Sequence, residues 1–142
     1  MKKVKIVILA FALMFSFIDY SYARTSVESL SQVEKLFMEE KYDRVVIESN
    51  RLIDEGAHGR EELFYLKGLS QMQLSRFKDA RETFKYMIER YHRERRAFDG
   101  SIGIGDAFFL EGRIPESITS YKEALNNYPD HKNASIVYHK LG

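Results

Sequence analysis

Residues 104–129, IGDAFFLEGRIPESITSYKEALNNYP, contain the pattern that decides the fold. A glycine at 105 is followed by small residues at 117 and 124, an aromatic residue at 121 and a proline at 129. Gly68, 37 residues earlier, is likewise followed by a small residue at 80 and an aromatic residue at 84. The pattern starts again at Gly142, 37 residues after Gly105. A period of this length indicates an array built from one repeated helical hairpin.

Helical spacing of apolar residues extends over most of the chain after residue 25. Gly56 and Gly112 mark helix ends, because glycine readily takes the left-handed conformation that ends many helices. Pro115 suits the first turn of a helix, where its missing N–H would have no helical partner. We therefore predict an all-α chain with helices at about residues 26–40, 45–55, 63–74, 77–91, 98–110, 115–128 and 133–141. The short links between them predict antiparallel neighbours.

This spacing resembles the tetratricopeptide repeat, a pair of antiparallel helices of about 34 residues. The units lie at about 26–59, 61–94 and 98–131, followed by residues 133–142. The third unit matches best, at Gly105, Phe108, Ser117, Tyr121, Ala124 and Pro129. The first is weakest, with Val33 in place of the usual glycine. The resemblance implies an α-solenoid of about three hairpins, with the last segment as a partial unit or a capping helix.

The first 23 residues have the three parts of a secretory signal peptide. Three lysines precede an apolar run from Ile6 to Ile18, and Ser21-Tyr22-Ala23 has small residues at the places a cleavage site requires. The apolar run is short of the roughly 20 residues that a membrane-spanning helix needs. We predict cleavage after Ala23, a repeat domain at 24–142 and a periplasmic or secreted location. An N-terminal membrane anchor is the alternative, and after cleavage no stable membrane insertion is expected.

Charge and cysteine content exclude several classes of function. Residues 24–142 carry 19 basic and 20 acidic side chains, whereas nucleic-acid-binding domains have a clear basic excess. The absence of cysteine excludes disulfides and thiolate metal sites, and in an exported protein it favours the bacterial periplasm.

No motif for catalysis, a metal or a cofactor is present in the sequence. The histidines, His58, His92, His131 and His139, lack the spacing of a metal-binding helix. The glycine-rich stretch 100–105 lacks the spacing of a phosphate-binding loop, and close helix packing explains it better. We interpret the basic stretch from Arg90 to Arg96 as a solvated link between hairpins, with an acidic partner or phosphate as the alternative.

The family resemblance implies a partner-binding groove lined by the first helix of each hairpin. The corresponding residues are Leu30, Glu34, Phe37 and Met38, then Tyr65, Leu69, Met72 and Gln73, and finally Ile102, Asp106, Phe109 and Leu110. Phe37, Met72 and Phe109 form one apolar position per unit, which suits a helix or an extended peptide of a partner. The alternative is that this row is core, or is covered by the last helix or by self-association.

Three classes of function follow from these observations. The first is a non-enzymatic scaffold of the bacterial cell envelope that binds another protein or peptide in the groove. The second is a self-associating or truncated part of a larger repeat protein, with a structural role in assembly through the C-terminal helix. An enzyme ranks last, because no catalytic set supports it.

Overall fold

The computed structural model describes residues 29–92 and 95–142, and every regular element in these ranges is a helix. The first helix includes residues 29–38. The others are α2 (Tyr42–Asp54), α3 (Arg60–Gln73), α4 (Phe77–Tyr91), α5 (Ala97–Leu110), α6 (Ile114–Asn127) and α7 (Ala134–Leu141). The all-α prediction is confirmed, and the predicted helix bounds differ by only a few residues. The proposed signal segment, 1–23, lies outside the described residues.

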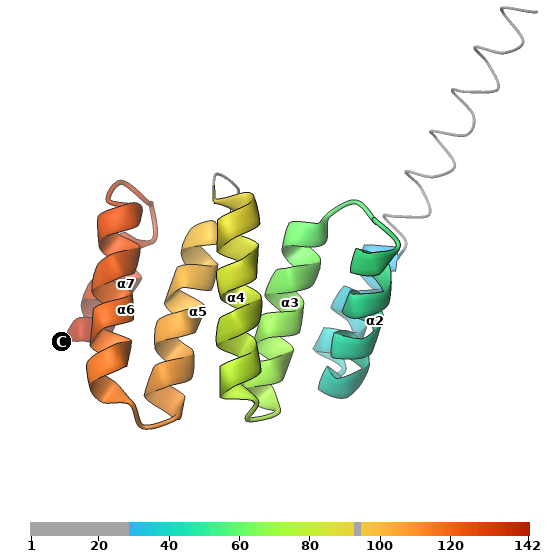
Figure 1. Cartoon of the computed structure of the whole chain (residues 1–142), viewed down its shortest axis with the longest axis horizontal. Helices are drawn as coiled ribbons and strands as arrows, with labels where there is room; N and C mark the ends of the chain where they lie inside the picture. The colour runs from blue at the N-terminus through green and yellow to red at the C-terminus, as the bar shows by residue number, and fades with distance from the viewer. Residues whose placement is uncertain (1–28, 93–94) are drawn as a thin grey trace, which may run out of the picture.

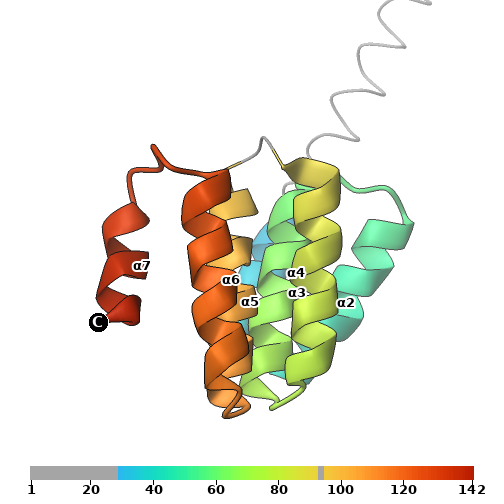
Figure 2. The same cartoon turned by 60° about the vertical axis from the view of Figure 1, so that its left-hand side comes forward.

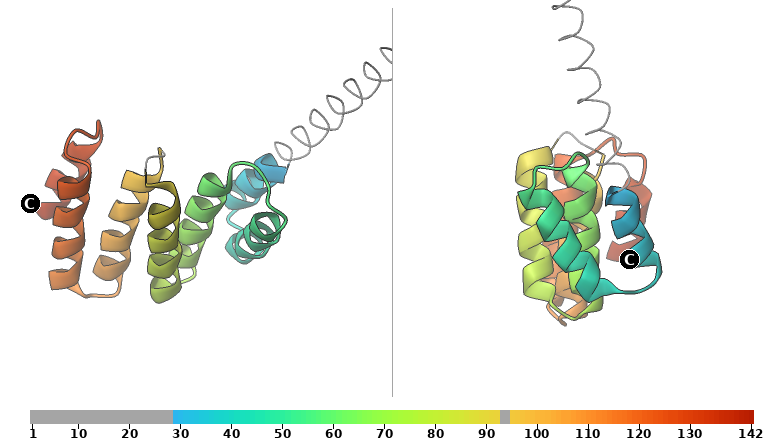
Figure 3. Two further views of the ribbon diagram at one scale, coloured as in Figure 1. Left: turned by 45° about the horizontal axis from the view of Figure 1, so that its top comes forward. Right: turned by 90° about the vertical axis from the view of Figure 1, so that its right-hand side faces the viewer.

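The helices stand side by side, and consecutive helices run in opposite directions (Figure 1). In Figure 2, α4 and α6 lie in front of α3 and α5, so that even- and odd-numbered helices form two layers. Seen from the end, α7 and the helix at 29–38 lie on the side away from α2 and α4 (Figure 3). From α2 to α7, each helix packs against its neighbours in sequence, and α3 also contacts α5. This sequential stack of hairpins agrees with the predicted solenoid.

The turn inside each hairpin has the same backbone geometry in all three hairpins. Its central residue, Glu40, Ser75 or Gly112, has a positive φ of 57°, 58° or 80°. In each case the N–H of the next residue bonds the carbonyl five residues back, as in Lys41 to Leu36, Arg76 to Gln71 and Arg113 to Phe108. This pattern is a Schellman motif, which satisfies carbonyls at the helix end. Of these three turn residues, only Gly112 was identified from the sequence as the residue that ends a helix, because glutamate and serine rarely take this conformation.

Glycines bring the helices of the second and third hairpins into close contact. A Cβ atom on Gly68 of α3 would lie 2.5 Å from the ring of Phe84, and one on Gly103 of α5 would lie 2.6 Å from the same ring. Gly105 stands equally close to the ring of Tyr121 on α6. The Phe84 ring is therefore held between two glycines from different hairpins. Close packing explains the glycine-rich stretch of α5, as the sequence analysis predicted.

In the first hairpin, the small and the large residue of the glycine–aromatic pair change places between the two helices. The glycine and the aromatic residue are 16 residues apart in the later hairpins, and the residues at the same spacing in the first are Val33 and Ser49. Both are fully buried. The larger side chain therefore lies on the first helix and the smaller one on the second. This exchange explains why the first unit departs from the glycine pattern.

The core consists of three clusters of buried residues along the stack. One joins the helix at 29–38 with α2 and α3, through residues such as Val33, Val45 and Leu63. The middle cluster surrounds Phe84 and Met87. The last joins α5, α6 and α7 and includes the fully buried Val137. The final helix is thus packed against the third hairpin.

Candidate functional site

The residues predicted to line a groove lie on the helix at 29–38, which we count with the odd-numbered helices, and on α3 and α5, and they differ in accessibility. Met38 is 82% exposed and Phe109 is 58% exposed. Glu34, Gln73 and Leu110 are also exposed, whereas Leu30, Phe37, Tyr65, Leu69, Met72 and Asp106 are half-buried. Ile102 is only 8% exposed and belongs to the cluster that contains Val137 of α7. Because α7 packs at this end, we leave Ile102 out of the accessible surface.

The three residues of the predicted apolar row, Phe37, Met72 and Phe109, differ in how much of each side chain is exposed to solvent. Phe37 packs against the first core cluster, and its ring contacts that of Tyr42 edge-on at a centroid distance of 5.6 Å. Met72 packs against the middle cluster. Only Phe109 presents most of its side chain to solvent. Among the predicted groove residues, the most exposed apolar side chains are therefore those at the ends of the first helix and of α5, Met38, Phe109 and Leu110.

An ion-pair cluster around Arg96 joins α3 to the start of α5. The guanidinium donates two hydrogen bonds to Glu62, at 2.8 and 2.7 Å, and a third to Asp99 at 3.0 Å. It also lies over the Tyr65 ring, 4.3 Å from the centroid. Hydrogen bonding to Glu62 raises the pKa of Arg96 above its usual value. Burial, with a contribution from Asp99, raises the pKa of the Tyr65 phenol.

This cluster corrects the prediction of a solvated basic link at Arg96. The side chain of Arg96 is only 25% exposed, and its donors are used inside the molecule. Arg95 remains largely exposed, with one contact to Glu62 at 3.4 Å. The repeat spacing could have predicted that these acidic groups lie near Arg96, since Glu62 and Asp99 are 37 residues apart and both occupy the first turn of an odd-numbered helix.

A second polar cluster holds α5, α6 and α7 together. The Tyr121 hydroxyl donates a hydrogen bond to Asp106, and Lys140 of α7 donates to the same carboxylate oxygen at 2.8 Å. Burial, followed by the hydrogen bond to Asp106, raises the pKa of Tyr121. Asp106 therefore has a structural function in addition to its place in the predicted groove.

The four histidines lie on separate segments of the fold. His131 stacks on Phe98 with ring centroids 4.0 Å apart, and His139 lies on α7. In the part of the chain that the structure describes, no group of three or more His, Asp or Glu is arranged to hold a metal ion. The same part contains no helix that is long and apolar enough to cross a membrane.

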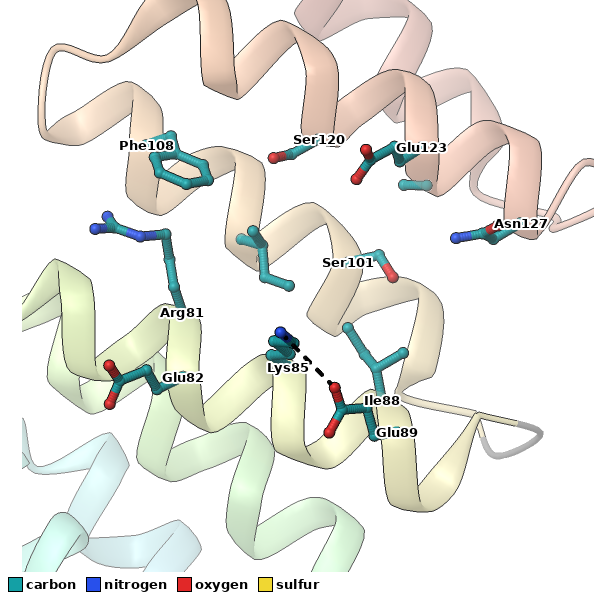
Figure 4. A pocket seen from close by; sticks show the side chains of 12 residues that line it. Arg81, Glu82, Lys85, Ile88, Glu89, Ser101, Phe108, Ser120, Glu123 and Asn127 are labelled. Atoms are coloured by element: carbon teal, nitrogen blue, oxygen red, sulfur yellow. Dashed lines mark ion pairs between the residues drawn. The ribbon is translucent and has the colours of Figure 1, made fainter.

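Two pockets lie between even-numbered helices, and sequence reasoning did not predict either. One, of about 520 Å³, lies between α4 and α6 with α5 beneath them (Figure 4). The other, of about 470 Å³, lies between α2 and α4 above α3. On α5, the pocket between α4 and α6 is lined by Ser101, Ile104 and Phe108, whereas the predicted groove residues of that helix are 102, 106, 109 and 110. The pocket and the predicted groove therefore use different faces of α5.

Comparison with known proteins identifies no relative. No family model matches the chain, and no curated protein matches it either. The resemblance to tetratricopeptide repeats thus depends on the residue pattern and on the recurring hairpin.

Proposed function

We propose that this chain is an exported, tetratricopeptide-like scaffold that binds another protein or peptide on the surface of its odd-numbered helices. The observation that carries the proposal is the recurrence of one hairpin, with the same turn at Glu40, Ser75 and Gly112. Stacked hairpins of this kind present one face of each first helix along a continuous surface. Scaffolds of this type act by binding and need no catalytic residues.

Exposed apolar side chains on this surface provide contact area for a partner protein. Met38, Phe109 and Leu110 expose more than half of their side chains. An apolar surface bordered by polar groups such as Glu34 and Gln73 suits an amphipathic segment of another protein. Methionine adds adaptability, since its side chain is flexible and polarizable.

A photo-crosslinking experiment tests this surface. A photoreactive phenylalanine analogue replaces Phe109 in one variant and the exposed Ile47 of α2 in the control. Both proteins are exposed to extract of the cell envelope and then irradiated. We expect a discrete crosslinked species from position 109 that Met38→Asp with Leu110→Asp reduces. Equal crosslinking from positions 109 and 47 would contradict the proposal.

Self-association is the second candidate, and exposed apolar residues on α6 and α7 favour it. Tyr138 is 63% exposed, and Ile114, Ile118 and Ile136 are also accessible. Sedimentation velocity over a range of protein concentrations measures this directly. Association that Tyr138→Asp abolishes would support it, and a monomer at every concentration would exclude it.

The location in the periplasm or outside the cell depends on the N-terminal segment. We expect the exported protein to begin at Arg24. N-terminal sequencing of protein from the periplasmic or secreted fraction tests this, and an intact Met1 in the membrane fraction would favour the anchored alternative.

A further inference from the structure

The pocket between α4 and α6 differs in its lining from the equivalent pocket between α2 and α4, one hairpin earlier. Phe64 of α3 and Tyr86 of α4 lie there, with ring centroids 5.1 Å apart, and the ring of Tyr91 is 6.2 Å from that of Phe64. The residues 37 positions later are Ser101 for Phe64 and Glu123 for Tyr86. Two packed aromatic rings are therefore replaced by a serine and a glutamate. A pocket lies at both places, but aromatic side chains line the earlier one, of about 470 Å³, where a serine and a glutamate line the later one, of about 520 Å³.

The floor of the pocket is more apolar than its counterpart. Lys67 and Gln71 of α3 correspond, 37 residues later, to Ile104 and Phe108 of α5. Ile88 of α4 adds a third apolar side chain to the lining. An open space above apolar side chains favours an apolar group, because its binding would remove apolar surface from water.

Charges around the pocket favour a positive neighbour for that apolar group. Arg81 is already used, since it pairs with Glu111 at 2.8 Å and lies over the Phe108 ring at 4.3 Å. The carboxylate of Glu123 has no ion pair or hydrogen bond within residues 29–92 and 95–142. Glu82 and Glu89 also line the pocket, but Glu82 lies 3.9 Å from Lys78 and Glu89 lies 3.9 Å from Lys85. The pocket lining thus contains three glutamates and two cations, and Glu123 is the charged group of this lining for which no ion pair is formed in the described residues.

Figure 4 shows these groups on opposite walls of the pocket. Lys85 and Ile88 project from α4, whereas Ser120, Glu123 and Asn127 follow one another along α6. We propose that this pocket binds a peptide segment with an aromatic side chain next to a basic one. The aromatic ring takes the place that the Phe64 ring has in the preceding hairpin, and the basic group pairs with Glu123.

A short peptide is the direct probe of this proposal. The probe is N-acetyl-phenylalanyl-arginine amide, titrated into the 15N-labelled protein with residues 24–142 intact and followed by NMR. We expect saturable shifts at Ser101, Ile104 and Glu123. Alanine in place of the phenylalanine is expected to weaken binding by about tenfold or more, since an aromatic side chain loses its burial. Glutamate in place of the arginine is expected to weaken binding as well.

Variants of the protein separate binding from folding. Ser101→Phe with Glu123→Tyr rebuilds the aromatic pair of the earlier hairpin, so the variant is expected to fold and to lose the saturable shifts. Glu123→Lys inverts one exposed charge and is expected to weaken binding of the probe. Lys122→Glu, on the neighbouring exposed residue, is the matched control and is expected to leave the shifts unchanged. Circular dichroism establishes whether each variant is folded. If the double variant fails to fold, binding of the probe to Glu123→Lys is the test of the proposal.

Three results would overturn the proposal. One is the absence of saturable shifts with the probe, and another is unchanged binding in Glu123→Lys. The third is a set of shifts at Met72 and Phe109 in place of those at Ser101 and Glu123. This last result would support the proposed odd-helix surface, so that the two proposals fail independently.

Discussion

Gly68→Ala tests whether the close contact between α3 and α4 is rigid. The added methyl group would lie 2.5, 2.7 and 2.9 Å from three atoms of the Phe84 ring. The ring is fully buried and cannot move away freely, because Gly103 of α5 stands against its other side. The substitution therefore forces either the ring or the two helices to move.

Two opposing effects set the magnitude of this change. Alanine in place of glycine within a helix stabilises by about 0.8–1 kcal/mol. An extra group in a well-packed core typically costs about 1–3 kcal/mol. We expect the cost to be near the upper end, because a ring held on two sides has no alternative rotamer to take. The net result is a loss of about 2 kcal/mol in the free energy of unfolding.

Urea denaturation followed by circular dichroism at the helical signal measures this loss. Gly100→Ala is the matched control, since its new methyl group would meet the flexible end of Met87 at 2.4 Å and side-chain atoms of Ile88 only at 3.5 Å or more. We expect this control to be as stable as the natural chain or slightly more so. A Gly68→Ala protein that is as stable as the Gly100→Ala protein would refute the argument for a ring held between two glycines.

Two further predictions concern other buried contacts. Val33→Gly and Ser49→Phe are each expected to destabilise the first hairpin. In a double-mutant cycle, the double variant is expected to lose less free energy of unfolding than the sum of the two single variants, by about 0.5–3 kcal/mol. Strict additivity would show that the two residues do not pack as a pair. The raised pKa of Tyr121 stabilises the fold fully below the unfolded pKa of about 10, and this contribution is lost as pH rises above it. Between about pH 9 and pH 11, Tyr121→Phe should therefore lose less stability than the natural chain in urea denaturation, and equal losses would contradict the assignment.

Local patterns were sufficient to predict the helices and most of their ends. The spacing of apolar residues determines which face of a helix is buried, and Gly56 and Gly112 take the left-handed conformation that ends α2 and α5. The turns at Glu40 and Ser75 were less visible, since their residues give no local signal for a positive φ. These two turns could have been predicted only by aligning Glu40 and Ser75 with Gly112, which occupies the same place in the third hairpin.

The candidate surfaces were predicted less completely, because accessibility depends on what packs from another helix. The repeat placed Ile102 in the predicted groove, but the burial of Ile102 depends on the cluster that includes Val137 of α7. The basic link was interpreted as solvated, but Arg96 meets Glu62 from a helix more than 30 positions earlier. Neither contact follows from spacing within one helix.

The sequence by itself determined an all-helical chain of stacked hairpins, since helix periodicity and helix ends are local properties of the chain. Only the tertiary structure decided which side chains come together to line the pockets between the hairpins. The packed rings of Phe64 and Tyr86 line the pocket between α2 and α4, whereas Ser101 and Glu123 line its counterpart between α4 and α6. The physical reason is that a pocket depends on the combined volume of side chains from three helices, which no single segment of the sequence contains.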